Sequence, residues 1–484
     1  MTLRGARIAP GRPQSISHGV MAATLASGIF MASGYVVNVW LGRLLGPEDY
    51  GRFGVAISLL TILNVVQGAV PQAVARATAQ DPASADGTLR RGVELQLGTA
   101  LLLMVGLGFG AWPIAGLLGD PQLVGPLLLC ALVLPPYGLL TLLIGFHNGR
   151  RFYTRQAITQ ATYAVTKAVG AIGLAYAFKL PGALVGYIVA ACLGVMVGWH
   201  RLWAPRSSVS SRQLVRFAGP LSVYALASTG LMSVDIFFVK AMVASPDAAG
   251  YYAAGQNIAR IPLFLVAGLA AIILPAVAGA GRRGVEATAA TASRALRWAL
   301  IIVIPMAAII LATSTPLAEL VYSASYRPAG AVLAVLSPAM AALAMASIVA
   351  GILGGVGRVA SPASFSVAGL AVTAVACLVL TPLAGVEGAA TATLIGSLVA
   401  LTGMALTLWR TIPGSLPLAS LVRVGIVSIV VGSVAWLLSA EGANLLIVYA
   451  ALGMLSGALL LGIREVTLRE VRELIGGGRR ERLD

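Results

Sequence analysis

The sequence has few of the residues that soluble enzymes use for chemistry. Only 10% of its 484 residues are charged, and it has three lysines, three histidines and three cysteines. Lys167, Lys179 and Lys240 are followed by Ala, Leu and Ala, so the Gly-Lys-Ser/Thr sequence that binds nucleotide phosphates does not occur. The histidines and cysteines show no metal-ligand spacing, and nothing resembles a nucleophile elbow. We therefore expect no cofactor, no metal site and no catalytic residue.

Hydrophobic residues, by contrast, make up 58% of the chain, and the mean hydropathy is +0.90. Apolar runs recur between residues 17 and 463, each close to the roughly 20 residues that cross about 30 Å of hydrocarbon. The sequence predicts an all-α polytopic membrane protein with about 14 transmembrane helices. The predicted outer loops are short, which leaves no room for an outer catalytic domain.

The net charge of +16 follows the order of the loops. Basic residues gather in alternate loops and in both tails, as the positive-inside rule describes. We therefore attribute the positive charge to membrane topology and expect no nucleic-acid partner. Both termini are then predicted to be cytoplasmic. The opposite turns contain five basic residues, Arg43, Arg52, Lys179, Lys240 and Arg327.

A short motif occurs twice, each time between two apolar spans. The segment PEDYGRF at 47–53 returns as PDAAGYY at 246–252, and VPQAVA at 70–75 is echoed by LPAVA at 274–278. Proline, an acidic residue and glycine are good turn chemistry, so we assign the motif to the fold and not to a site. Two bundles of like topology are the layout of an alternating-access transporter.

The repeat defines the predicted domains. We expect two pseudo-symmetric six-helix bundles, a linker rich in serine and arginine, an appended pair of helices without a counterpart in the repeat, and a basic tail. In order these are residues 1–203 (first lobe), 204–216 (linker), 217–410 (second lobe), 411–464 (two further helices) and 465–484 (cytoplasmic tail).

Two cations lie about midway along predicted spans. Burying an ionised side chain there costs roughly 2.5 to 3.5 kcal/mol on insertion scales, so such a residue is a functional candidate. Lys167 follows Gln160 and Tyr163 on one helical face, and Arg260 follows Gln256 and Asn257. We predict that these six residues line a central cavity and attract an anionic group such as a diphosphate. The alternative is that a neighbouring carboxylate or carbonyl neutralises each cation and fixes helix packing.

Asp235 is the acidic counterpart of these cations, in the outer third of the seventh span. Two interpretations stay open. It is either a proton or sodium site that couples transport to an ion gradient, or the ion-pair partner of Arg260 or Lys240.

Three segments together resemble a known family: LGRLLGPEDYGRFGVAISLL at 41–60, VPQAVARATA at 70–79 and VDIFFVKAMVASPDAAGYYAAGQNIARIPLF at 234–264. They are similar to the polysaccharide biosynthesis branch of the multidrug/oligosaccharidyl-lipid/polysaccharide exporter (MOP) superfamily, the O-antigen-type flippases. The resemblance implies a flippase of the bacterial cytoplasmic membrane that moves an undecaprenyl diphosphate-linked glycan by alternating access. Its further partners would be membrane lipids, H⁺ or Na⁺, and glycan polymerase or assembly proteins.

Other members of the superfamily and two non-transport roles are alternatives. Lipid II flippases also have 14 spans and a basic cavity, but the first two spans here lack their arginine-rich pattern. Multidrug/toxin antiporters usually have 12 spans and bind cations through acidic residues, which are scarce in these spans. A membrane glycosyltransferase would need larger outer loops, and a scaffold of a glycan-assembly complex would not need polar stripes in both lobes.

Overall fold

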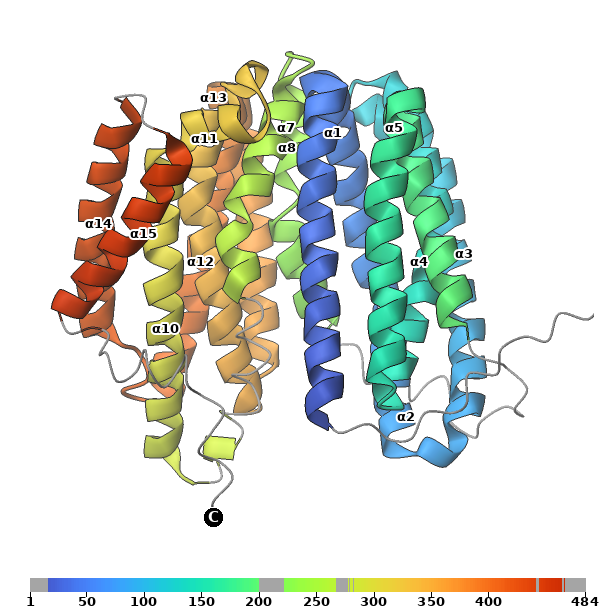
Figure 1. The fold of residues 1–484 in the computed structure, drawn as a ribbon, viewed down its shortest axis with the longest axis horizontal. Coiled ribbons are helices and arrows are strands. Elements are labelled where there is room, and N and C mark those ends of the chain that lie inside the picture. Colours follow the sequence, from blue (N-terminus) through green and yellow to red (C-terminus); the bar gives the residue numbers. More distant parts are fainter. Residues whose placement is uncertain are drawn as a thin grey trace, which may run out of the picture. The chain divides into compact units, whose positions relative to one another are not determined.

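The computed structural model describes residues 16–199, 222–266, 277, 279–281, 283–440, 444–463 and 465. The predicted linker 204–216, the tail beyond residue 465 and most of the echo at 274–278 lie outside the described residues. Within the described part every regular element is a helix (Figure 1). Among the described residues, nine helical spans are long and apolar enough to cross a membrane. The predicted all-α class is confirmed.

The chain divides into two compact units, Met1–Ser233 and Val234–Asp484. The boundary between the units falls inside the helical stretch Ser222–Met242. The first unit contains α1 (Ile16–Gln67), α2 (Ala69–Gln80), α3 (Ala85–Leu117), α4 (Val124–Gly149) and α5 (Tyr153–Gly198), with short turns η1 (Pro82–Ser84) and η2 (Pro121–Leu123). The second contains α7 (Asp235–Met242), α8 (Ala248–Ala259), α10 (Val285–Ala312), α11 (Ser314–Val321), η3 (Ala324–Tyr326), α12 (Ala329–Gly355), α13 (Ala360–Thr411), α14 (Leu418–Ala440) and α15 (Leu445–Gly462).

Three helices are too long for one crossing, since a rise of about 1.5 Å per residue brings 20 residues across the hydrocarbon. Helices α1 and α13 have 52 residues each and α5 has 46. Each contains a non-helical break, at Gly46 in α1, at Lys179 in α5 and at Ala384 and Gly385 in α13. Counted as two crossings each, they bring the nine spans of the described residues to twelve, which is roughly consistent with the predicted 14.

The two halves of α5 form a tight antiparallel hairpin, and so do those of α13. A Cβ atom placed on Gly182 would lie 2.1 Å from the carbonyl oxygen of Leu174, and one on Gly388 would lie 2.0 Å from that of Leu380. Both glycines stand three residues after their break, so the hairpins correspond with an offset of 206 residues. Small residues allow this close backbone approach, which drives helix association inside a bilayer.

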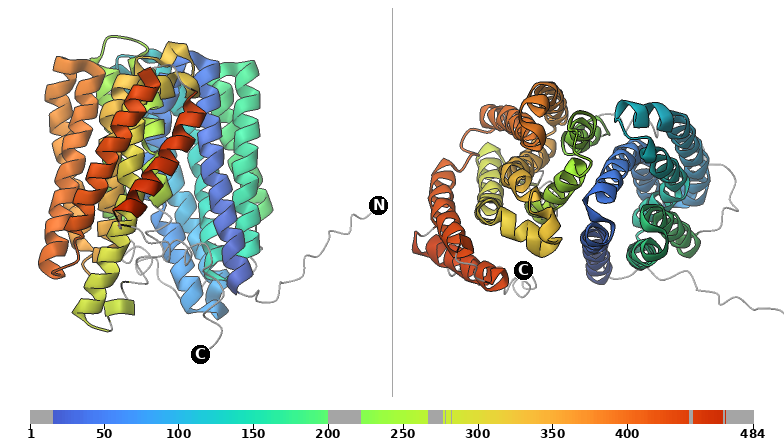
Figure 2. Two further views of the ribbon diagram at one scale, coloured as in Figure 1. Left: turned by 60° about the vertical axis from the view of Figure 1, so that its left-hand side comes forward. Right: turned by 90° about the horizontal axis from the view of Figure 1, so that it is seen from above.

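The appended helices α14 and α15 pack on the second unit through α10 (Figure 2). Val427 and Val431 of α14 form a buried cluster with Val448 and Leu452 of α15 and with Ile309 of α10.

Candidate functional site

Lys167 lies in the first half of α5 and is 5% exposed. Its Nζ atom is 5.0 Å from the ring centroid of Phe30, 5.6 Å from that of Tyr163 and 5.8 Å from that of Tyr187. The three rings come from α1 and from both halves of α5. Aromatic faces attract a cation at such distances, by about 0.5 to 2 kcal/mol each. The hairpin of α5 therefore places the lysine in an aromatic cage.

No carboxylate neutralises this lysine within the part of the chain that the structure describes. Cation–π contacts are the interactions that Nζ makes there. Gly34 of α1 lies beside it, and a Cβ atom at that position would be 3.9 Å from Nζ. The predicted alternative of a neighbouring carboxylate partner is thus not found among the described residues. The charge is held by ring faces alone, which replace only part of its hydration.

The other two members of the predicted stripe behave differently. Tyr163 is buried and its ring lies 5.9 Å from that of Phe30 and 5.5 Å from that of Tyr137. It therefore belongs to the cage. Gln160, one turn earlier, is half-buried and makes no side-chain hydrogen bond within the described residues.

Asp235, at the start of α7, is completely buried and accepts four hydrogen bonds. Tyr252 of α8 and Thr393 of α13 donate their hydroxyls to Oδ2 at 2.7 Å each. Gln256 Nε2 and the Ile236 backbone N–H donate to Oδ1 at 3.0 Å and 2.9 Å. Hydrogen bonds to a carboxylate are about twice as strong as neutral ones. This carboxylate therefore joins three helices of the second unit.

Arg260 ends α8 and is half-exposed. Its positive charge attracts the carboxylate of Asp235 electrostatically. The side chains that donate hydrogen bonds to this carboxylate, by contrast, are uncharged. Asn257 donates instead to the hydroxyl of Tyr322 at 2.9 Å. In the second unit the structure therefore brings Gln256 to Asp235 and places Asn257 apart from them.

Phe30, Tyr187, Tyr252 and Thr393 are contacts that sequence reasoning missed. Tyr187 and Thr393 are 206 residues apart, so they occupy equivalent places in the two hairpins. Phe53 and Tyr252 end the two copies of the repeated motif. Phe53 packs edge-on against Tyr187 at 6.3 Å, whereas Tyr252 and Thr393 meet on a carboxylate. Equivalent positions thus contact a buried cation in the first unit and a buried anion in the second. In the second unit one of these contacts, Tyr252, belongs to the repeated motif.

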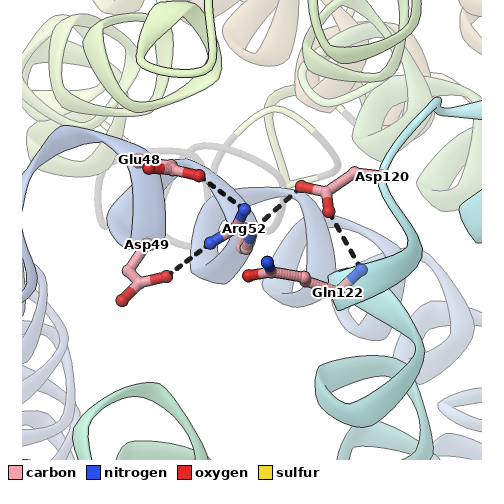
Figure 3. A network of polar contacts seen from close by, with 5 residues as sticks. All are labelled: Glu48, Asp49, Arg52, Asp120 and Gln122. Atoms are coloured by element: carbon pink, nitrogen blue, oxygen red, sulfur yellow. Dashed lines mark hydrogen bonds and ion pairs between the residues drawn. The ribbon is translucent and has the colours of Figure 1, made fainter.

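The first unit has another charged cluster where the break in α1 meets the α3–α4 turn (Figure 3). Arg52 is 8% exposed and contacts three carboxylates, Glu48 at 2.6 Å, Asp49 at 2.8 Å and Asp120 at 2.8 Å. The side chain of Asp120 also caps η2 by accepting from the Gln122 backbone N–H. The sequence places Arg52 in a turn, and the structure shows that its guanidinium links this turn to the α3–α4 turn through Asp120.

Three solved structures share this fold. "Lipid II flippase MurJ, inward closed conformation" aligns with a TM-score of 0.75 at 13% identity, over 94% of this chain and 100% of that one. An inward-facing multidrug resistance MATE family transporter of the MOP superfamily aligns at 0.69 and 15% identity, over 80% and 98%. A MOP superfamily transporter from Pyrococcus furiosus aligns at 0.58 and 16% identity, over 82% and 96%. The chain therefore has the fold that these three membrane proteins share.

The sequence family described as "Polysaccharide biosynthesis protein" matches residues 40–331. Because this is more than half of the chain, the protein belongs to that family, and the predicted resemblance is confirmed. A comparison with curated proteins gives no match.

Proposed function

We propose that this protein is a flippase that moves an isoprenoid diphosphate-linked oligosaccharide across the cytoplasmic membrane by alternating access, for the assembly of cell-surface polysaccharide. The family and the transporter fold support the general class. The observation that carries the substrate chemistry is the aromatic cage of Lys167, in which a buried cation has no carboxylate partner among the described residues.

A diphosphate supplies what this cage lacks. Removing an ammonium from water is unfavourable, and an anion brought next to it repays that free energy. Arg260, half-exposed at the end of α8, would hold phosphate oxygens in a bidentate fork, while Lys167 would act as a point charge. Gln160 and Tyr163 would be the polar groups near Lys167, and Gln256 and Asn257 those near Arg260.

Asp235 is our candidate for coupling to H⁺ or Na⁺. Its carboxylate accepts hydrogen bonds from side chains of α8 and α13. A bound cation or proton would displace at least one of these donors, because a protonated or metal-bound oxygen accepts fewer hydrogen bonds. Ion binding would thereby change the contact between three helices of the second unit, which is what coupling requires.

The second candidate function is a lipid II flippase, favoured by the alignment of such a flippase over 94% of this chain. It shares the lipid diphosphate chemistry and differs in the saccharide. A multidrug/toxin antiporter and a scaffold for a glycan-assembly complex follow. Both of these predict that Lys167 is dispensable for anionic substrates.

Complementation of a strain that lacks its own polysaccharide flippase tests the proposal. We expect the wild type to restore surface glycan, and Lys167→Gln and Arg260→Gln to fail at equal membrane abundance. Lys179→Gln, which removes a lysine charge at the exposed turn of α5, is the matched control and should restore it. Restoration by all variants would reject the role of the two cations. Failure of the wild type, together with rescue of a lipid II flippase mutant, would favour the second candidate.

A further inference from the structure

The second unit has a long apolar groove between α14 and the helices α10, α12 and α13. Its volume is about 1100 Å³, and its walls include Leu300 and Leu311 of α10, Met345 of α12, Leu398 of α13, and Leu421 and Gly425 of α14. Two of the three hydroxyl side chains in the walls bond to carbonyl groups of their own helices. Ser428 donates to the Val424 carbonyl at 2.7 Å, and Thr402 donates to that of Leu398 at 2.7 Å. The groove therefore presents hydrocarbon to whatever fills it.

A second pocket, more polar than the groove, adjoins it at Pro417. It has a volume of about 610 Å³, shares Pro417 with the groove, and is lined by Ser293, Arg294 and Arg297 of α10 and Ser420 of α14. One carboxylate, Glu286, also lies in its lining. The pocket thus has an excess of positive charge and hydroxyl donors where the hydrocarbon walls end.

The two arginines of the pocket differ in how they are held. Arg297 Nε lies 3.2 Å from the buried Glu465 carboxylate, and its guanidinium lies 5.8 Å from the ring of Trp298. Arg294 is exposed and makes no hydrogen bond or ion pair within the described part of the chain. A fixed arginine beside an unengaged one is a good arrangement for phosphate, because guanidinium groups bind its oxygens through paired N–H donors.

We propose that this pocket and groove bind one anionic phospholipid from the leaflet that faces the basic loops. Its phosphate would lie on Arg294 and Arg297, and its acyl chains would lie between α14 and α10. The charge complementarity selects an anionic head group. Tryptophan next to arginine is typical of the membrane interface, which puts the pocket at head-group depth. The site is distinct from the head-group cations of the proposed substrate.

The groove, with a volume of about 1100 Å³, has room for the acyl chains of a phospholipid. An isoprenoid phosphate would present the same phosphate to the two arginines, and the undecaprenyl phosphate probe distinguishes the two lipids. A bound lipid would fill the space that the contact of the appended pair with α10 leaves open.

Native mass spectrometry of the purified, delipidated protein tests this proposal with three probes: phosphatidylglycerol, phosphatidylcholine and undecaprenyl phosphate. We expect one phosphatidylglycerol to be retained in preference to phosphatidylcholine. Arg294→Gln should weaken this binding about fivefold, the effect of one arginine on an anionic lipid. Because Arg294 is exposed and unengaged, its replacement leaves the fold intact. The measurement does not involve transport, so it stands whether or not the flippase proposal holds.

The groove itself is tested by filling it. Gly425 of α14 lines the groove, and a Cβ atom there would meet nothing within 4 Å, so Gly425→Phe places a ring at the groove wall and should displace the acyl chains. Gly453→Phe on α15 is the matched control, since Gly453 also faces open space but lies outside the groove. We expect loss of the retained lipid in the first variant and none in the second. Equal retention of phosphatidylcholine, equal effects of the two glycine variants, or preference for undecaprenyl phosphate would each overturn the proposal.

Discussion

Lys179 and Gly385 adopt the same backbone conformation at equivalent turns of the two units. Their φ and ψ angles are 51° and −135° for the lysine, and 57° and −133° for the glycine. Both residues join the halves of a tight helical hairpin. Glycine reaches this region without steric cost, whereas a residue with a Cβ atom is strained there by about 1 to 3 kcal/mol. The first unit therefore carries strain that its counterpart avoids.

We expect Lys179→Gly to stabilise the protein by about 1 kcal/mol, the relief of strain less the greater freedom of glycine in the unfolded chain. Gly385→Ala should destabilise it by about 1 to 2 kcal/mol. Thermal unfolding in detergent measures both. Lys179→Ala is the control, because it removes the charge and keeps the positive φ. A gain in Lys179→Ala equal to that in Lys179→Gly would contradict the argument from strain.

The Arg52 cluster predicts a second stability effect. Arg52→Met would remove the Arg52 cation from the buried Asp120 carboxylate, and breaking such a buried pair destabilises by about 3 kcal/mol or more. Asp120→Asn in the same chain should recover much of this loss, because the amide carries no charge and still accepts from the Gln122 N–H. Unfolding of the two single variants and the double variant measures the coupling.

Glu48→Gln is the matched control for this cluster. Glu48 is 48% exposed at its side chain, and exposed ion pairs contribute about 0 to 1 kcal/mol. A loss in Glu48→Gln as large as in Arg52→Met would mean that the buried partner Asp120 is not the source of the effect.

These contacts show which parts of the molecule local sequence could predict. Transmembrane helices can be predicted because each one is a continuous apolar run. Lys167 and Asp235 can be recognised as candidates because each places a charge inside such a run. The residues that contact these two side chains cannot be predicted from local sequence, because they lie far away in the chain. Thr393, for example, is 158 residues from Asp235. Asp120 likewise lies 68 residues from Arg52. The groove beside α14 depends on which helix faces pack together, and a uniformly apolar sequence does not show this.

The aromatic cage of Lys167 predicts that a substitution there changes transport strongly and stability little. Lys167→Met keeps a long side chain among the three rings and removes a charge that burial disfavours. The lost cation–π attraction and the relieved desolvation are of similar size, so stability should stay within about 1 kcal/mol. Transport should fall at least about tenfold, since a tenfold change corresponds to about 1.4 kcal/mol of lost head-group attraction. Unfolding and flipping in proteoliposomes measure the two effects. Parallel losses in both would make Lys167 a packing residue.

Asp235 offers a test of whether its hydrogen bonds are charge-assisted. Thr393→Val removes one donor and should destabilise the wild type by about 1.5 to 3 kcal/mol, the range for a hydrogen bond to a charged group. In an Asp235→Asn background the same change should cost about 0.5 to 1.5 kcal/mol, as for a neutral pair. Ser397→Ala, one turn further along α13, removes a hydroxyl that bonds to the Thr393 carbonyl and not to the aspartate. Its effect should not depend on the background. Equal costs of Thr393→Val in both backgrounds would show that Thr393 acts through its own helix, where it also bonds to the Ala389 carbonyl at 3.2 Å.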